Sequence, residues 1–209
     1  MNIDKVILRV ILNTLAAIAA LFVFLFSTLI IFFPSTMMSF TYDIGMDAAS
    51  ISYAKREYKR TDDIYYIARA TETAIGIGDD GKIFSCGKAF IADDEFAAYC
   101  ADMNKNKPEE ATIGYEQYIY GQVCVSEYAL GKKASAVNRA FGYIGDDFPK
   151  QNAVAAVLVS ALLKNDTVTV ELIKGKMEEM QVANLSEVDK AYHAEILTLI
   201  EKEMDKLTD

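Results

Sequence analysis

One short stretch of the chain concentrates side chains suited to binding: "YAKREYKR" at residues 53–60. Tyr53, Arg56 and Arg60 are spaced by three and four residues, so a helix would place them on one face. Arginine makes charge-assisted hydrogen bonds to carboxylates, and tyrosine adds a rigid contact area. This face is therefore predicted to bind an acidic peptide or a terminal carboxylate. The alternative is a solvated outer face, or a segment resting near lipid headgroups.

A second pair of candidate binding residues lies further along the chain. Tyr118 and Gln122 are four residues apart on a helix expected over about 110–130, so both could point to the same surface. We predict that they bind a protein or peptide, whereas the nearby Tyr128 is expected to pack in the core.

Residue types that support catalysis or metal binding are sparse. His193, the only histidine, lies beside an apolar stripe, and we expect it to be a bystander. Cys86, Cys100 and Cys124 form no Cys-x-x-Cys pair and are expected to be small buried hydrophobes. A Cys86–Cys100 bridge between antiparallel helices is the alternative. Neither a catalytic triad nor a metal-ligand set is visible, so we predict no enzyme activity, no metal and no cofactor.

The N-terminal part, residues 1–34, is predicted to hold a membrane anchor. Residues 10–33 carry no charge, and a helix of that length covers about 36 Å, enough for a hydrocarbon core of about 30 Å. A cleaved signal peptide would have a shorter apolar region and a small-x-small site after it, which is lacking here. Lys5 and Arg9 precede the span, so the N-terminus is expected in the cytoplasm and the rest outside it.

Within the predicted span, three residues could contact another transmembrane helix. Ala16 and Ala20 form a small-x-x-x-small pair, and Asn13 lies one turn before them. Small residues allow close approach of helices in lipid, and asparagine can hydrogen-bond across the contact. Self-association through the span is therefore possible, with plain anchoring as the alternative.

Beyond a linker expected at 35–46, the chain is predicted to form one helical domain over 47–209. The chain as a whole has a net charge of −9, which repels phosphate backbones, so nucleic acid is not expected as a partner. A small phrase, Ile-Gly-x-acid, recurs at residues 44–47, 77–80, 113–116 and 144–147. We interpret it as the end of one helix, with a left-handed glycine, followed by a capping acid for the next.

Each interval between these phrases holds two helical patterns. The expected helices are 47–60, 63–76, 80–91, 94–104, 110–130, 133–143, 147–163 and a segment ending near 180. A terminal helix is expected from the capping box at Ser186 and Asp189 to about residue 207. The stretch "TVTVELI" at 167–173 alternates like a strand, but no second strand pattern exists to pair with it, so a helix is predicted.

The stretch "VCVSEYALGKKASAVNRAF" at 123–141 resembles the tetratricopeptide repeat family, with Tyr128, Gly131, Ala136 and Ala140 at matching positions. The stretch at 57–75 follows the family pattern more loosely, and the chain has no tryptophan. The resemblance implies an all-α solenoid of about four helix hairpins with a terminal capping helix. Other helical-hairpin solenoids share these features.

These observations lead to one main expectation for function. The chain is predicted to be a single-pass membrane protein whose helical repeats act as an adaptor, binding another protein or peptide near the membrane. The alternative is a structural subunit that is held in a larger membrane assembly through its transmembrane helix.

Overall fold

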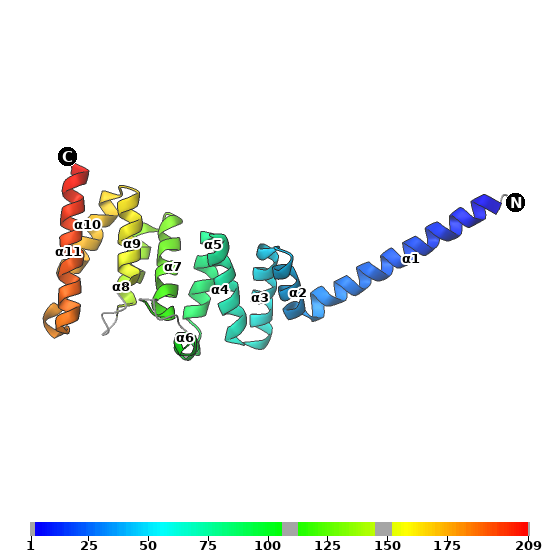
Figure 1. Cartoon of the computed structure of the whole chain (residues 1–209), viewed down its shortest axis with the longest axis horizontal. Helices are drawn as coiled ribbons and strands as arrows, with labels where there is room; N and C mark the ends of the chain where they lie inside the picture. The colour runs from blue at the N-terminus through cyan, green and yellow to red at the C-terminus, as the bar shows by residue number, and fades with distance from the viewer. Residues whose placement is uncertain (1–2, 106–112, 145–151, 209) are drawn as a thin grey trace. The chain divides into compact units, whose positions relative to one another are not determined.

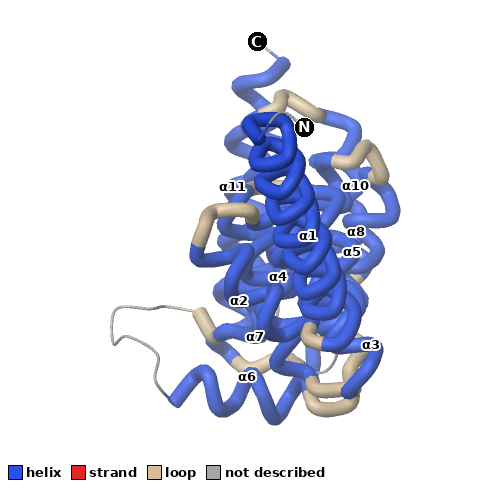
Figure 2. The backbone as a smooth tube through the Cα atoms, turned by 90° about the vertical axis from the view of Figure 1, so that its right-hand side faces the viewer, coloured by secondary structure: helices blue, strands red, loops and turns tan. Residues whose placement is uncertain are grey.

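The structure is a computed structural model and describes residues 3–105, 113–144 and 152–208. Within these ranges every regular element is a helix and none is a strand, as Figure 1 and Figure 2 show. The prediction of an all-α chain with one long apolar helix near its N-terminus is confirmed. The chain divides into two compact units, Met1–Tyr66 and Ile67–Asp209.

The first unit contains α1 (Ile3–Phe32), α2 (Pro34–Asp43) and α3 (Asp47–Thr61). Within α1, Val10–Phe32 is a run of 23 residues with a mean hydropathy of 2.8, and none of its most apolar window is buried. By length and composition this segment can cross a membrane. Its bounds agree with the predicted span to within one residue.

Residues 35–46, expected to be a linker, instead contain most of the helix α2. Pro34 occupies the start of this helix, where a missing N–H has no consequence. The buried residues of α2 are Pro34, Met37, Met38 and Thr41. Their spacing of three, one and three is that of an amphipathic helix, and α2 packs on α3, where Ser50 Oγ donates to the Met38 carbonyl at 3.1 Å. The same spacing is visible in the sequence and could have predicted this helix.

The helix α4 (Ile64–Ile77) begins in the first unit and continues into the second. The further helices of the second unit are α5 (Asp80–Ile91), α6 (Phe96–Lys105), α7 (Tyr115–Ala129), α8 (Lys133–Gly142), α9 (Asn152–Leu163), α10 (Thr167–Glu179) and α11 (Glu187–Thr208), with a short 3-10 helix at Val182–Asn184. The stretch "TVTVELI" is helical, as predicted, and forms the start of α10. The helix predicted over 110–130 begins at Tyr115, and residues 110–112 and 147–151 lie outside the described residues.

The glycine of the recurring Ile-Gly-x-acid phrase has the predicted left-handed conformation at two copies and a different one at a third, whereas the predicted cap is wrong at the first copy, where Met46 and not Asp47 is the N-cap of α3 and makes no side-chain hydrogen bond. Gly45 and Gly78 have φ of +73° and +67°, the left-handed region that ends α2 and α4. Gly114 is extended, with φ of −73°, and is the N-cap of α7. At the second copy Asp79, and not the predicted Asp80, caps the next helix by accepting the Lys82 N–H at 3.0 Å. The fourth glycine, Gly145, lies outside the described residues.

The helix α7 lies at the centre of the second unit, in contact with α5, α6, α8 and α9. Two glycines let its neighbours approach closely. A Cβ added at Gly87 on α5 would lie 2.4 Å from Val123 Cγ2 on α7, and one at Gly121 on α7 would lie 3.6 Å from the Ala156 Cβ on α9. A larger residue at Gly87 would therefore force α5 and Val123 apart, whereas the contact at Gly121 is already of ordinary van der Waals length.

The core of this unit continues into its C-terminal helices. It consists of Cys124, Tyr128, Ala136, Val137, Ala140, Ile144, Ala153, Val154, Val157, Leu158, Ala161, Val170, Ile173, Met177, Ile196 and Ile200. An aromatic cluster lies on the other side of α7. There Phe90, fully buried, makes edge-to-face contacts with Phe96 and Tyr99 at ring-centroid distances of 4.9 and 5.5 Å.

Gly87→Ala is expected to destabilise the second unit by about 1–3 kcal/mol, because the new Cβ overlaps a β-branched side chain that cannot rotate away. Gly175→Ala is the matched control. It lies inside α10 with no atom within 4 Å of its added Cβ, and it is expected to stabilise by about 0.5–1 kcal/mol. Chemical unfolding followed by circular dichroism measures both. Recovery of stability in the Gly87→Ala, Val123→Ala double variant would confirm the overlap, and an unchanged Gly87→Ala variant would contradict it.

Candidate functional site

The predicted binding residues of α3 are already engaged within the first unit. The Arg56 guanidinium donates from Nη1 to the Ile30 carbonyl at 3.0 Å and from Nη2 to the Ile31 carbonyl at 3.2 Å. Arg60 pairs with the Glu57 carboxylate, one hydrogen bond of which runs from Nε at 3.1 Å. Tyr53 is half-buried on the same helix. Both guanidinium groups therefore bind groups of this chain, and their use by a peptide stays a prediction.

The position of Arg56 has a clear physical reason. The last four carbonyls of an α-helix lack partners inside the helix, and α1 ends at Phe32. Arg56 supplies donors to two of these carbonyls, and its positive charge lies at the negative end of the helix dipole. Sequence spacing alone placed Arg56 on a face of α3 but did not reveal that α1 ends against it.

The second predicted pair lies on α7, in the other unit. Tyr118 is 37% exposed and Gln122 is half-buried. Tyr128 is buried at 3% exposure, as predicted. A surface role for Tyr118 and Gln122 therefore stays open as a prediction.

The predicted contact residues of the span, Asn13, Ala16 and Ala20, are all exposed on α1. Each therefore offers its side chain to lipid or to another helix, as the prediction requires.

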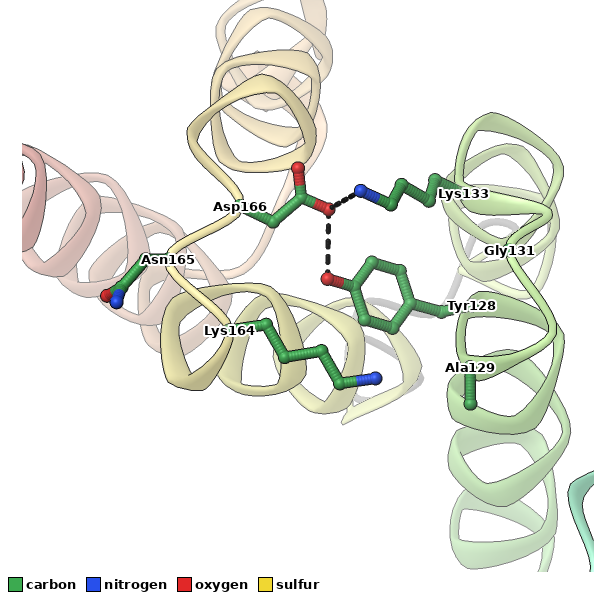
Figure 3. A pocket seen from close by; sticks show the side chains of 7 residues that line it. All are labelled: Tyr128, Ala129, Gly131, Lys133, Lys164, Asn165 and Asp166. Carbon is green, nitrogen blue, oxygen red and sulfur yellow. Dashed lines mark hydrogen bonds and ion pairs between the residues drawn. The ribbon is translucent and has the colours of Figure 1, made fainter.

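A pocket of about 320 Å³ lies between two hairpin turns of the second unit (Figure 3). One wall is the turn between α7 and α8, and the other is the turn between α9 and α10. Its lining residues are Tyr128, Ala129, Gly131, Lys133, Lys164, Asn165 and Asp166. The two turns use left-handed backbone, with φ of +80° at Gly131 and +51° at Asn165.

Asp166 is the residue through which these two turns are joined. Its Oδ2 accepts hydrogen bonds from the Tyr128 hydroxyl at 2.9 Å and the Thr169 hydroxyl at 2.7 Å, and Lys133 Nζ lies 2.8 Å away (Figure 3). Its Oδ1 caps α10 by accepting the Thr169 N–H at 3.4 Å. The sequence showed an aspartate at a turn, and its cap position was readable. The partners on α7 and α8 were not.

These contacts fix the protonation states in the pocket. Burial disfavours the charged carboxylate, but hydrogen bonds from Lys133, Thr169 and Tyr128 together outweigh it and lower the pKa of Asp166 to about 2. Burial, and then the hydrogen bond to Asp166, raise the pKa of the Tyr128 hydroxyl to about 12. Near neutral pH the pair is a fixed acceptor and a fixed donor. The arrangement is that of a structural joint, since a carboxylate of such low pKa is a weak base.

The mouth of the pocket is locally positive. Lys133 and Asp166 offset each other, and Lys164 adds a further charge, with its Nζ 5.0 Å from the centre of the Tyr128 ring. In a chain with net charge −9, this is a place where a carboxylate of another molecule could be accepted.

Large aliphatic side chains flank the same α9–α10 turn. Leu163, the last residue of α9, is 81% exposed, and Val168, in the first turn of α10, is 74% exposed. Val159 and Leu172, each four residues further from the turn, are 49% and 36% exposed. We name these four residues the aliphatic face. A sequence signal existed, because α9 is apolar all round ("NAVAAVLVSALL") and cannot bury every side.

The remaining chemically capable residues have structural roles. Each of the three cysteines is buried and reduced, so the Cys86–Cys100 bridge is not formed. Burial raises the pKa of the Cys100 and Cys124 thiols to about 12, which makes them poor nucleophiles. The His193 Nε2–H donates to the Met177 carbonyl at 2.8 Å and joins α11 to α10. Among the described residues, no group of three or more His, Cys, Asp or Glu side chains is placed to hold a metal ion.

No protein-family model matches this chain, and neither a curated protein nor a solved structure does.

Asp166→Asn is expected to remove part of the acid sensitivity of the second unit. A carboxyl whose folded pKa is lowered stabilises the fold above its unfolded pKa of about 4, and this contribution is lost as the pH falls through about 2. Between these pH values the unmodified protein should lose about 1–2 kcal/mol of unfolding free energy that the variant does not lose. Denaturant titrations at several pH values measure the unfolding free energy of both proteins. Because the two proteins share all other carboxylates, the contributions of those groups cancel in the difference between them. Parallel pH profiles of the two proteins would contradict the role of Asp166.

Proposed function

We propose that this chain is a single-pass membrane protein that acts as an adaptor, with its second unit binding a segment of another protein near the membrane. Its N-terminus lies in the cytoplasm and its helical part outside, in accord with Lys5 and Arg9 before the span. The stacked helix hairpins of a tetratricopeptide-like solenoid form the binding unit. The alternation of short helices and glycine turns supports this arrangement.

The observation that carries the proposal is the exposure of the aliphatic face at the α9–α10 turn. Leu163 and Val168 stand on the two sides of a turn, both with more than 70% of their surface exposed. Burying such a side chain fully stabilises a complex by about 1.5–3 kcal/mol. Large exposed aliphatic residues that lie together are characteristic of protein-binding surfaces.

The charge beside the aliphatic face defines the chemistry of the partner. Lys164 follows Leu163 in the chain and lines one wall of the pocket, and Lys133 lines the opposite wall. A segment with apolar side chains next to a carboxylate, either acidic side chain or C-terminus, fits both features. The partner is therefore a protein segment and not a nucleic acid or a small cofactor.

The variant Leu163→Ser, Val168→Thr should lower the amount of co-purifying partner about tenfold or more, because each change removes apolar area from the contact. The full-length protein is extracted in mild detergent, and proteins that co-purify near stoichiometry are quantified by mass spectrometry. Leu199→Ser is the matched control, since Leu199 is a 40% exposed leucine on α11. Tyr118→Ala, Gln122→Ala tests the surface of α7 in the same assay. An undiminished partner in the first variant would overturn the proposed site.

A structural subunit held through its span is the second candidate, and the surface of α1 favours it. The window of this helix that is apolar enough to cross a membrane has no buried residue, and the segment contains the polar, exposed Asn13. Such a surface can pack against other transmembrane helices.

Ala16→Leu, Ala20→Leu is expected to weaken assembly if the span makes the contact, because larger side chains separate close-packed helices by steric overlap. Sedimentation of the detergent-extracted complex measures its size. Ile18→Leu serves as the control because it changes shape without adding volume. If the Ala16→Leu, Ala20→Leu variant forms a complex of the same size as the unmodified protein, this contact is excluded and α1 is an anchor alone.

A further inference from the structure

We infer that α2 and the turn after it form a platform that lies in the headgroup layer of the membrane, beside the end of the span. The inference rests on the proposal that α1 crosses a membrane. It adds a second contact with lipid, made by Phe33, Phe40 and Ile44.

The level of this platform follows from Arg56. Its guanidinium hydrogen-bonds to the Ile30 and Ile31 carbonyls at 3.0 and 3.2 Å, and both of these residues belong to the segment Val10–Phe32. The hydrogen bonds place this part of α3 at the level of the last turn of the span. With α1 across a bilayer, that level is the boundary between hydrocarbon and headgroups, where an arginine can reach water or phosphate.

The direction of α2 keeps it at that boundary. Figure 1 shows α2 and α3 running across the direction of α1 rather than continuing it. The ten residues of α2 make a helix about 15 Å long. A helix of this length that continued along the membrane normal would leave the headgroup layer, whereas one that lies across the normal remains in it along its length.

The exposed residues of α2 are of the types found at membrane interfaces. Phe33, Phe40 and Ile44 are 52%, 48% and 52% exposed, and their spacing of seven and four residues puts them along one side of the helix. This strip begins directly after Phe32, so it continues the apolar surface of the span. The residues buried on α3, such as Met37 and Met38, take a neighbouring side. Aromatic residues at this level anchor helices in the interface.

The charges of α3 agree with the same placement. Lys55 and Lys59 are four residues apart and lie on either side of Arg56 in the sequence. Their long side chains can extend toward phosphate groups while their stems stay near apolar surface. A headgroup layer also accommodates the nearby carboxylate of Asp43, which lies at the exposed end of α2.

Tryptophan fluorescence in vesicles tests the inference directly, because the chain contains no tryptophan. Three full-length variants, Phe22→Trp, Phe40→Trp and Ile44→Trp, are reconstituted into phosphatidylcholine vesicles and excited where tyrosine does not absorb. Quenching is compared between lipids brominated near the headgroup and lipids brominated near the end of the acyl chain. Phe22 lies near the middle of the span and reports on the anchor itself, while Ile44→Trp gives a second report if Phe40→Trp perturbs α2.

We expect Phe22→Trp to be quenched best by the deep bromines. Phe40→Trp and Ile44→Trp should emit at a shorter wavelength than a tryptophan that is fully exposed to water. Both should be quenched about twofold more by the shallow bromines than by the deep ones. If Phe22→Trp is quenched but the other two are reached only by acrylamide from the water, the platform is excluded and the anchor stands. If brominated lipid quenches none of the three, α1 does not cross the bilayer, and the proposed anchoring fails together with the inference.

Discussion

The close packing of α7 between α5 and α9 is the contact on which the second unit depends. On the α5 side it requires Gly87, because a Cβ there would lie 2.4 Å from Val123 Cγ2, whereas a Cβ at Gly121 would meet the Ala156 Cβ at an ordinary 3.6 Å. The contact of α7 with α8 is both apolar and polar. Cys124 and Tyr128 share the core with Ala136, Val137 and Ala140, and Glu127, 2% exposed, accepts hydrogen bonds from Ser135 and Arg139. Helices that are held this closely on several sides act as a rigid frame for the turns at their ends.

Two carboxylates of the second unit, Glu127 and Asp166, are buried and paired with positive side chains. Burial raises the pKa of Glu127, but its hydrogen bonds to Arg139 and Ser135 lower the pKa by more. In the same way, hydrogen bonds from Lys133, Thr169 and Tyr128 lower the pKa of Asp166 by more than burial raises it. Glu127 joins the two helices of one hairpin, α7 and α8, and Asp166 joins that hairpin to the α9–α10 turn. Both remain ionised near neutral pH, so removal of a partner would leave a charge without compensation.

Local features of this chain could be read from its sequence, and contacts between distant segments could not. The long uncharged run, the helix patterns and the glycines at 45 and 78 each depend on residues within a turn or two, and all were predicted. The helix α2 had a readable amphipathic pattern, but residues 35–46 were predicted to be a linker. Gly114 looked like the other glycines of its phrase, yet its backbone is extended and it is the N-cap of α7. The partners of Arg56 and Asp166 lie 25 to 38 residues away, and no spacing rule reaches that far.

The hydrogen bonds between Arg56 and the end of α1 also have a mechanical consequence. A single helix in a bilayer can turn about its own long axis, and a connection through Phe33 alone would act as a swivel. Two donors gripping adjacent carbonyls, which point in different directions around the helix, stop that swivel. Because of these hydrogen bonds, α1 and α3 turn together about the axis of α1. With α1 in a bilayer as proposed, a torque exerted on it by lipids or by a neighbouring span would be transmitted to α3.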